Sequence, residues 1–316
     1  MSILKKTIKW IAILLAIIYV GLIAYAYWPA PAGEPVEQLA GPDDLFVTVD
    51  GLQLRYQIWG SSGPDKQNLV LMHGFANSVQ TFKRLGPLLT DRYFVVAVDL
   101  PGFGLSAKPT DHNYGNASQA QVISLFIGAL GMREVIIGGH SMGGALAVHV
   151  AEQAPVVTGI LMLNPGIITT GVPAITEYLV FPFPRIAAKI FGQRDFRERF
   201  LGNSFLNPEL ITAETMDAMM LGPRSDDYMS GATTLMSYYK AGDEIQMLGD
   251  IRVPTLIVWG DQDRGKPAGE AEQLLSMIPA SQLVRIQDAG HYVHEEQPQA
   301  VADALLTNTA FWGARR

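Results

Sequence analysis

The chain of 316 residues contains no cysteine. That absence excludes disulfide bonds, thiolate metal sites, iron–sulfur clusters and a cysteine nucleophile. Charged residues make up only 17% of the sequence, and 30 acidic residues against 23 basic ones give a formal net charge of -7. Proteins that bind nucleic acid generally present a basic face, so this balance argues against nucleic acid as a partner.

Motifs that bind nucleotides or metals are missing as well. The stretch from Gly102 to Ser106 lacks the third glycine of a dinucleotide-binding fingerprint, and no G-x-x-x-x-G-K-[ST] loop occurs. The sequence has no H-E-x-x-H motif and no cluster of histidine and carboxylate residues with metal-ligand spacing. We therefore expect neither a cofactor nor a metal ion.

One long segment lacks charge altogether. It runs for nineteen residues from Trp10 to Trp28, and Lys5, Lys6 and Lys9 precede it. As a helix it would be about 28 Å long, close to the hydrocarbon thickness of a bilayer. The aromatic residues at its far end suit a membrane interface, and the lysines favour a cytoplasmic N-terminus. We expect residues 1–28 to be a signal-anchor transmembrane helix, with the remainder on the periplasmic or extracellular side.

A cleaved secretory signal is the alternative. Ala24-Tyr25-Ala26 resembles a small-x-small cleavage site, and cleavage near Ala26 would release a secreted protein. The apolar run is longer than the usual h-region of about 7–15 residues, which favours the anchor. Residues 29–42 are rich in Pro, Gly and Ala and are expected to form a stiff, extended linker to a globular domain at 43–316.

The globular part alternates short apolar runs with helix-like segments. Asp50-Gly51 between two alternating runs is a strong signal for a hairpin. The pattern predicts an α/β fold with a mostly parallel eight-stranded sheet, helices on both faces and a helical cap insertion at about 166–249, where no buried strand is evident. Expected strands are 45–49, 52–59, 69–72, 94–98, 135–137, 160–163, 255–258 and 283–286, and expected helices are 81–89, 118–130, 142–153, 267–278 and 297–312.

The sharpest local motif is G-x-S-x-G around Ser141, between a predicted strand and a predicted helix. Such a turn exposes the serine Oγ and needs glycines because the backbone is strained and closely packed. A serine hydroxyl becomes a nucleophile only when a base accepts its proton.

Of the 6 histidines, His291 follows the last predicted strand and is the expected base, with His294 as its nearest competitor. Asp261 and Asp263, after the preceding strand, are both candidates for the carboxylate that orients the imidazole. Asn164 occupies the other position where such folds carry the acid, but an amide cannot serve. The other four histidines are expected to be structural or solvated: His73, His112, His140 and His149.

Five motifs follow one another in the order of one known family. They are His73-Gly74-Phe75, the D-x-P-G-x-G-x-S stretch Asp99–Ser106, Gly139–Gly144, the G-x-x-D stretch Gly260–Asp263, and Gly290-His291 followed by Glu296 and Pro298.

From about Asp43 to Trp312 the chain thus resembles the α/β-hydrolase superfamily of serine hydrolases, most of all membrane-anchored bacterial lipases and esterases. The resemblance implies a catalytic triad of Ser141, Asp263 and His291. It also implies an oxyanion hole formed by the backbone N–H groups of Phe75 and Met142.

By this resemblance we expect a serine esterase or lipase that acts on a small, apolar acyl ester. A carbon–carbon bond hydrolase of ring-cleavage products is the alternative, and a non-catalytic binding protein on the same fold is a third reading. We expect the aromatic residues of the cap either to line an acyl pocket or to pack on the sheet. The arginines of the cap are expected on a solvated helix face. These residues are Tyr178, Phe181, Phe183 and Phe191, and Arg185, Arg194, Arg197 and Arg199.

Overall fold

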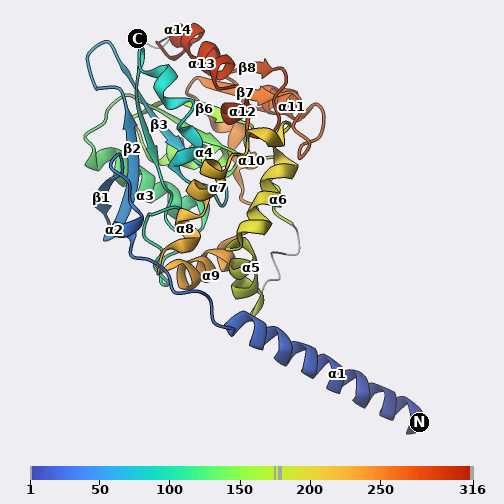
Figure 1. The fold of residues 1–316 in the computed structure, drawn as a ribbon. Coiled ribbons are helices and arrows are strands. Elements are labelled where there is room, and N and C mark those ends of the chain that lie inside the picture. Colours follow the sequence, from blue (N-terminus) through green and yellow to red (C-terminus); the bar gives the residue numbers. More distant parts are fainter. Residues whose placement is uncertain (1, 174–175, 177–179, 314–316) are drawn as a thin grey trace.

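A computed structural model describes residues 2–173, 176 and 180–313. An eight-stranded sheet forms its centre, with the strand order β1-β2-β4-β3-β5-β6-β7-β8 (Figure 1). Strands β1, β2 and β4 pair antiparallel and all the other pairs are parallel, which confirms the predicted mostly parallel sheet. The strands are β1 (Leu45–Val49), β2 (Leu52–Trp59), β3 (Gln67–Met72), β4 (Tyr93–Val98), β5 (Val135–His140), β6 (Val157–Leu163), β7 (Thr255–Gly260) and β8 (Ser281–Ile286).

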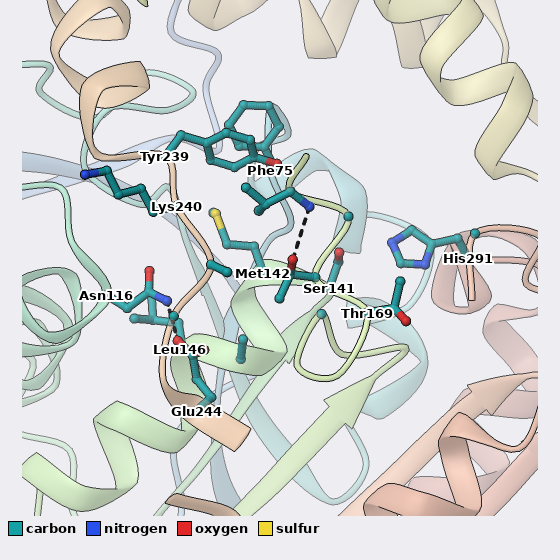
Figure 2. Close-up of a pocket in the computed structure, with 18 of the residues that line it drawn as sticks. Phe75, Asn116, Ser141, Met142, Leu146, Thr169, Tyr239, Lys240, Glu244 and His291 are labelled. Carbon is teal, nitrogen blue, oxygen red and sulfur yellow. Dashed lines mark hydrogen bonds between the residues drawn. The ribbon is translucent and has the colours of Figure 1, made fainter. Parts of the chain in front are cut away.

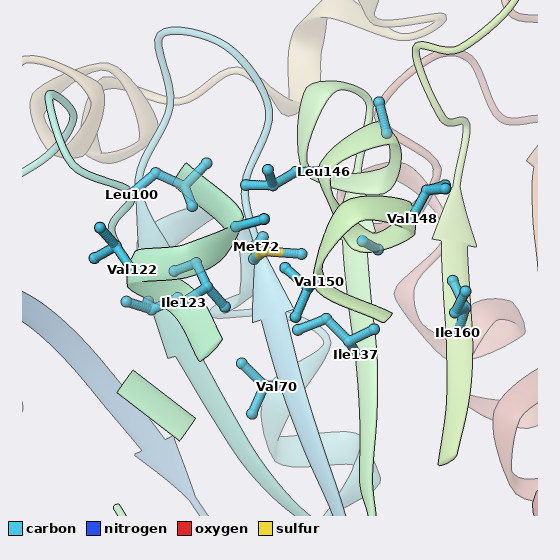
Figure 3. Packing of buried hydrophobic residues seen from close by; sticks show 14 of the residues in the cluster. Val70, Met72, Leu100, Val122, Ile123, Ile137, Leu146, Val148, Val150 and Ile160 are labelled. Atoms are coloured by element: carbon cyan, nitrogen blue, oxygen red, sulfur yellow. The ribbon is translucent and has the colours of Figure 1, made fainter. Parts of the chain in front are cut away.

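The central strands are apolar throughout because helices cover both faces of the sheet. Successive side chains of a strand point to opposite faces, so Val70 and Met72 of β3 join one core and Leu69 and Leu71 join the other. Figure 3 shows the first core, where Val70 and Met72 pack beneath side chains from the helices that follow β4 and β5.

In the described part of the chain, two helices precede the first strand and are described below, and the other helices outside the cap lie between or after the strands. They are α3 (Asn116–Ala129), α4 (Met142–Gln153), α11 (Glu270–Met277), α12 (Val293–Glu296), α13 (Pro298–Thr307) and α14 (Thr309–Gly313).

The predicted helix at 81–89 is wrong in detail. Two short 3-10 turns, Val79–Phe82 and Gly86–Leu89, replace it. Pro87 lacks a backbone N–H and Gly86 disfavours helix, so a continuous α-helix is not stable there. The predicted strand at 135–137 is also too short, because β5 continues through two glycines to His140. A Cβ at Gly138 would lie 2.9 Å from the Leu71 side chain, so the strand there is packed too closely for a larger residue.

Only helices and turns occupy the described part of the interval between β6 and β7. We call residues 166–249 the cap segment. Its helices are α5 (Phe183–Phe191), α6 (Arg194–Ser204), α7 (Ala213–Met219), α8 (Leu221–Arg224), α9 (Tyr228–Tyr238) and α10 (Glu244–Met247).

The N-terminal helix α1 (Ser2–Tyr27) projects away from the rest of the molecule, and its C-terminal end lies beside α5 (Figure 1). Its stretch Ile3–Tyr27 is long and apolar enough to cross a membrane, and its most apolar window is not buried in the protein.

The expectation of an extended linker at 29–42 is wrong in part. Residues Val36–Leu39 form a short helix, α2, that buries Leu39. Glu34 pairs with Ser225 in an isolated β-bridge and its carboxylate forms an ion pair with Arg224 at 2.8 Å. Glu34 therefore fixes this segment against the cap at α8.

Candidate active site

Ser141 lies in the sharp turn between β5 and α4. Its backbone has φ 51° and ψ -114°, a strained conformation for a residue with a side chain. The turn needs the neighbouring glycines, since a Cβ at Gly139 would lie 2.2 Å from Gly143 C and one at Gly143 would lie 2.2 Å from Met72 O. Ser141 lines a cavity of about 420 Å³.

His291 and Asp263 line the same cavity and contact each other. His291 Nδ1 lies 2.7 Å from Asp263 Oδ2, and the aspartate side chain is 1% exposed against 18% for the histidine. In Figure 2 the His291 imidazole faces Ser141. No hydrogen bond joins Ser141 Oγ to His291 among the described residues. Catalytic hydrogen bonds are often long without substrate, so this geometry is compatible with proton transfer from the serine.

The Asp263 carboxylate is held in its ionised form. Burial by itself would raise its pKa, but the hydrogen bond and charge of His291 and the bonds from Gly265 N and Asn164 hold the pKa below its ordinary value. Asn164 Nδ2 donates to Asp263 Oδ2 at 2.9 Å, and Asn164 Oδ1 accepts from Gly260 N at 3.0 Å. Asn164 thus ties the end of β6 to the turn that carries the carboxylate.

Asp261, the other candidate acid, lies outside this arrangement. Its carboxylate pairs with Arg285 Nη1 at 2.5 Å near the surface, and Asp261 does not line the cavity. Of the two aspartates, Asp263, the one that the family resemblance implied, is the one that contacts His291.

His140 packs behind His291, away from the cavity. Its Nε2 lies 2.9 Å from the backbone carbonyl oxygen of His291. A carbonyl only accepts, so His140 Nε2 carries the proton, and the buried Nδ1 has no partner among the described residues. Burial, with the neighbouring His294 and His291, holds the pKa of His140 well below its usual value. His140 is therefore a neutral group that fixes the backbone of His291.

His294, the competing candidate base, is fully buried and does not line the cavity. Its Nε2 lies 2.8 Å from Thr81 Oγ1. Burial, helped by the nearby His291, lowers its pKa to about 3. The geometry therefore favours His291 over His294 as a base toward Ser141.

The remaining histidines stand apart from the serine. His73 Nε2 accepts from Leu100 N at 3.1 Å beneath the loop that follows β3, and the His112 ring contacts Tyr114. His149 Nε2 lies 3.1 Å from Glu244 Oε1.

His149, Asp243 and Glu244 are also the one group of described residues whose ligand atoms are close enough for a metal ion, within 4.8 Å of one another. Burial alone would lower the pKa of His149, but the hydrogen bond and charge of Glu244 raise it. The arrangement is that of an ion pair, which fixes the start of α10 against α4.

The loop after β3 passes close to the serine and carries Phe75, while Met142 directly follows Ser141. A Cβ at Gly74 would lie 2.9 Å from His140 Nδ1 and 3.3 Å from Ser141 Cβ, so glycine allows the loop to pass this close to the serine. Neither Phe75 N nor Met142 N donates to another protein group among the described residues, and both residues line the cavity. Two unpaired donors beside a serine are suited to binding a developing oxyanion.

Apolar side chains form most of the cavity wall, with polar groups at its far end. In Figure 2, Asn116, Leu146 and Glu244 lie on the side of Ser141 opposite to His291. The apolar lining comprises Phe75, Leu100, Phe103, Met142, Ala145, Leu146, Phe200 and Leu235, together with the rings of Tyr114, Tyr238 and Tyr239.

The cap aromatics were expected either to line this cavity or to pack on the sheet, and those that are described do not line it. Phe191 packs edge-on against the Phe75 ring, with centroids 5.0 Å apart, and Phe181 and Phe183 are exposed on the surface. Tyr178 lies outside the described residues.

The prediction of a solvated arginine face is wrong for Arg197, which is 5% exposed. Its guanidinium donates to the carbonyl oxygens of Ala76 at 2.5 Å, Phe191 at 2.6 Å and Met219 at 2.9 Å. These three hydrogen bonds join α6 to the loop after β3 and to its neighbours in the cap, and they compensate for the burial of the cation.

Sequence reasoning also missed the part played by Glu296. Its carboxylate accepts from Gly290 N at 3.0 Å and from Leu206 N at 2.8 Å, so it links the loop of His291 to the cap segment. Glu296 stands in the histidine-loop motif of the sequence, but the motif does not show that its carboxylate bonds to Gly290 N and Leu206 N.

Comparison with known proteins identifies the family to which the chain belongs. The family model of the alpha/beta hydrolase fold matches residues 67–298. The uncharacterized hydrolase YugF of Bacillus subtilis is 29% identical over 82% of this chain and 94% of its own, and Lipase 1 of Psychrobacter immobilis is 27% identical over 74% of each. The crystal structure of a membrane phospholipase A, described as a bacterial virulence factor, is 26% identical, superposes with a TM-score of 0.68 and covers 98% of both chains. The chain belongs to the α/β-hydrolase fold family.

Proposed function

We propose that this protein is a serine hydrolase of carboxylic esters, with Ser141 as nucleophile, His291 as general base and Asp263 as the residue that orients His291. One observation carries the proposal. A single cavity is lined by Ser141, whose backbone is strained, and by His291, whose Nδ1 lies 2.7 Å from the buried Oδ2 of Asp263. The serine hydroxyl can attack a carbonyl carbon, the imidazole can accept its proton, and the carboxylate can hold the imidazole in the required tautomer.

The reaction proceeds in two balanced steps. Ser141 Oγ attacks the ester carbonyl while His291 Nε2 accepts its proton, and the tetrahedral oxyanion accepts hydrogen bonds from Phe75 N and Met142 N. Collapse breaks the bond to the alkoxide, which leaves with the proton from His291. A water molecule then gives a proton to His291 and attacks the acyl-serine. The bond to Ser141 Oγ breaks, the acid leaves, and His291 returns the proton to Ser141 Oγ. Each oxyanion donor typically contributes about 2.7–4 kcal/mol to transition-state stabilisation.

The cavity supports an apolar acyl ester as substrate. Aromatic and aliphatic side chains form most of its wall, which favours burial of a hydrocarbon chain. Two of the similar proteins are named a lipase and a phospholipase A. Both names denote cleavage of esters of fatty acids.

For the N-terminal part we propose a membrane anchor at residues 1–28, a segment at 29–42 and a hydrolase domain at 43–316 with a cap at about 166–249. The N-terminus would be cytoplasmic and the catalytic domain periplasmic or extracellular. Ala26, where a signal peptidase would cut, is 1% exposed, and its carbonyl accepts from Arg185 Nε at 3.1 Å. These contacts favour a retained helix over cleavage.

Hydrolysis of p-nitrophenyl esters from acetate to palmitate by the full-length protein in detergent tests the proposal. We expect turnover that Ser141→Ala abolishes and that Ser276→Ala, on the surface of α11, leaves unchanged. A dienoate diketone serves as the carbon–carbon substrate. Cleavage of the diketone without ester turnover would replace the proposal with the carbon–carbon hydrolase, and turnover of neither substrate would favour a binding protein.

A further inference from the structure

The C-terminal end of α1 is fixed to the cap by two cations of α5. The last carbonyl groups of a helix lack partners within the helix. Arg185 Nε donates to Ala26 O at 3.1 Å, and Lys189 Nζ donates to Tyr25 O at 2.9 Å and to Trp28 O at 2.7 Å. Positive charge at this end also complements the helix dipole. The helix is therefore held in one orientation against α5 and is not a free tether.

A contact further back along α1 shows how the cap lies beside it. Tyr19 Oη donates to the backbone oxygen of Phe181 at 3.2 Å, and the Phe181 ring lies 6.1 Å from the Tyr27 ring. Tyr19 precedes Tyr27 by eight residues, or about 12 Å along the helix axis. The turn that enters α5 thus reaches back along α1 from its C-terminal end, between the levels of these two tyrosines.

This turn presents apolar side chains to the outside. Val180 is 67% exposed, Phe181 53% and Phe183 38%. Fully burying an apolar side chain of this kind is worth about 1.5–3 kcal/mol, so a cluster of three in water is unfavourable. We call Val180–Phe183 the apolar turn.

The length of α1 sets the depth of the apolar turn in a bilayer. A hydrocarbon core of about 30 Å takes about 20 helical residues. If the core began as early as Ile3, it would end near Ile23, and a core that began at Trp10 would end beyond Trp28. Phe181 lies between the levels of Tyr19 and Tyr27. Phe181 is therefore at the boundary of the hydrocarbon core if the core begins at Ile3, and inside the core if it begins at Trp10.

We infer that the apolar turn inserts into the leaflet that faces the catalytic domain, so that the cap rests on a phospholipid bilayer. A backbone carbonyl at that depth needs a protein partner because water is scarce there, and Tyr19 Oη supplies one to Phe181. The inference rests on the proposed membrane anchor and identifies the lipid surface as the partner of the cap.

Insertion would also connect the bilayer to the cavity wall. Helix α5 packs on α9, and Leu235 and Tyr238 of α9 line the cavity. The ring of Phe191, at the end of α5, contacts the Phe75 ring. The surface on which the cap rests is thus one helix away from the proposed substrate site, which suits an ester that arrives from the membrane.

The absence of cysteine makes this depth measurable with a single label. Val180→Cys and Phe183→Cys carry an environment-sensitive fluorophore in the full-length protein, reconstituted in phosphatidylcholine and phosphatidylglycerol vesicles. Leu275→Cys on α11, similarly apolar, partly exposed and far from α1 in Figure 1, is the matched control. Quenching is measured with iodide in the water and with phosphatidylcholine that carries a doxyl group near the headgroup end of its acyl chain.

The doxyl lipid should reduce fluorescence at positions 180 and 183 about twofold, while iodide quenches only the label at 275. Iodide quenching at 180 and 183 equal to that at 275 would overturn the inference, because the apolar turn would then lie in water. Protection from iodide without doxyl quenching would also overturn it, because a second copy of the chain would then cover the turn.

Ester hydrolysis by the same labelled proteins separates this inference from the proposed function. Activity without lipid quenching rejects the insertion alone. Lipid quenching without activity supports the insertion and rejects the proposed hydrolase.

Discussion

Asn164 Nδ2 lies 2.9 Å from Asp263 Oδ2, the carboxylate oxygen that also contacts His291 Nδ1. The amide is buried at the end of β6, beside the strand that leads to Asp263. One oxygen therefore receives two hydrogen bonds, which fixes the carboxylate in position and favours its ionised form. Asn164 cannot itself serve as the acid, but its amide donates a hydrogen bond that positions the carboxylate of Asp263.

Asn164→Ala should lower kcat for ester hydrolysis about tenfold or more and leave KM nearly unchanged. A hydrogen bond to a charged group is worth about 1.5–3 kcal/mol, and Asn164 does not line the cavity. The pKa of Asp263 should rise, so the acid limb of the pH–rate profile moves to higher pH. Asn68→Ala is the control, because it removes the hydrogen bond from a partly buried asparagine at the start of β3 to Arg133 O and lies outside the cavity. A lower melting temperature with an unchanged pH profile would show that Asn164 only supports the fold.

Arg197→Met should destabilise the protein by about 3 kcal/mol or more, because three carbonyl oxygens at the junction of cap and core lose their donor. Arg199→Met on the exposed face of the same helix is the matched control and should change stability by less than about 0.5 kcal/mol. Thermal unfolding of both variants in one detergent measures the difference. Equal melting temperatures would contradict the contribution assigned to Arg197.

Glu295→Gln should stabilise the protein at alkaline pH. Burial raises the pKa of Glu295 from 4.5 to about 7, so the folded state holds this proton more tightly than the unfolded state. The resulting stability is complete below about pH 4.5 and is lost as pH rises to about 7. The variant should gain about 2–3 kcal/mol at pH 8 and little at pH 4.5.

Denaturant unfolding at both pH values measures the effect of Glu295→Gln. Glu198→Gln, on the exposed face of α6, is the control and should show no such dependence. A gain for Glu295→Gln that is the same at both pH values would mean that the carboxyl group titrates normally.

Leu146→Trp should shorten the preferred acyl chain. Leu146 lines the cavity on the side of Ser141 that lies away from His291 (Figure 2). The larger ring should reduce kcat/KM for p-nitrophenyl palmitate about tenfold or more and change acetate turnover little. Leu146→Met, which nearly conserves volume, is the control. An unchanged chain-length profile would show that the acyl chain lies elsewhere.

The central strands were predictable because helices cover both faces of the sheet there, and β1 and β2 because apolar and polar residues alternate along them. Each buried strand, such as Leu69–Met72, therefore appears as a short apolar run, and turn residues such as Asp50-Gly51 separate the runs. The extension of β5 to His140 was not predictable in the same way. Glycine has little strand propensity, so two glycines do not predict a strand. Position 138 is a glycine because the neighbouring side chains leave no room for a larger residue.

Residues at the ends of strands could be found from local motifs, and Ser141 and His291 are examples. The roles of Asn164 and Arg197 could not be found in this way, because their partners Asp263 and Ala76 are 99 and 121 residues away along the chain. Contacts of this kind depend on the packing of the cap and on strand order, which local periodicity does not encode.

Covalent labelling by a fluorophosphonate tests the central claim most directly. The reagent reacts with a serine only when a neighbouring base and an oxyanion hole activate it. Intact-mass and peptide mass spectrometry should show one adduct per chain, located on Ser141, that is absent in Ser141→Ala and much slower to form in His291→Ala. No adduct on the folded wild-type protein, or an adduct on another serine, would contradict the proposed catalytic centre.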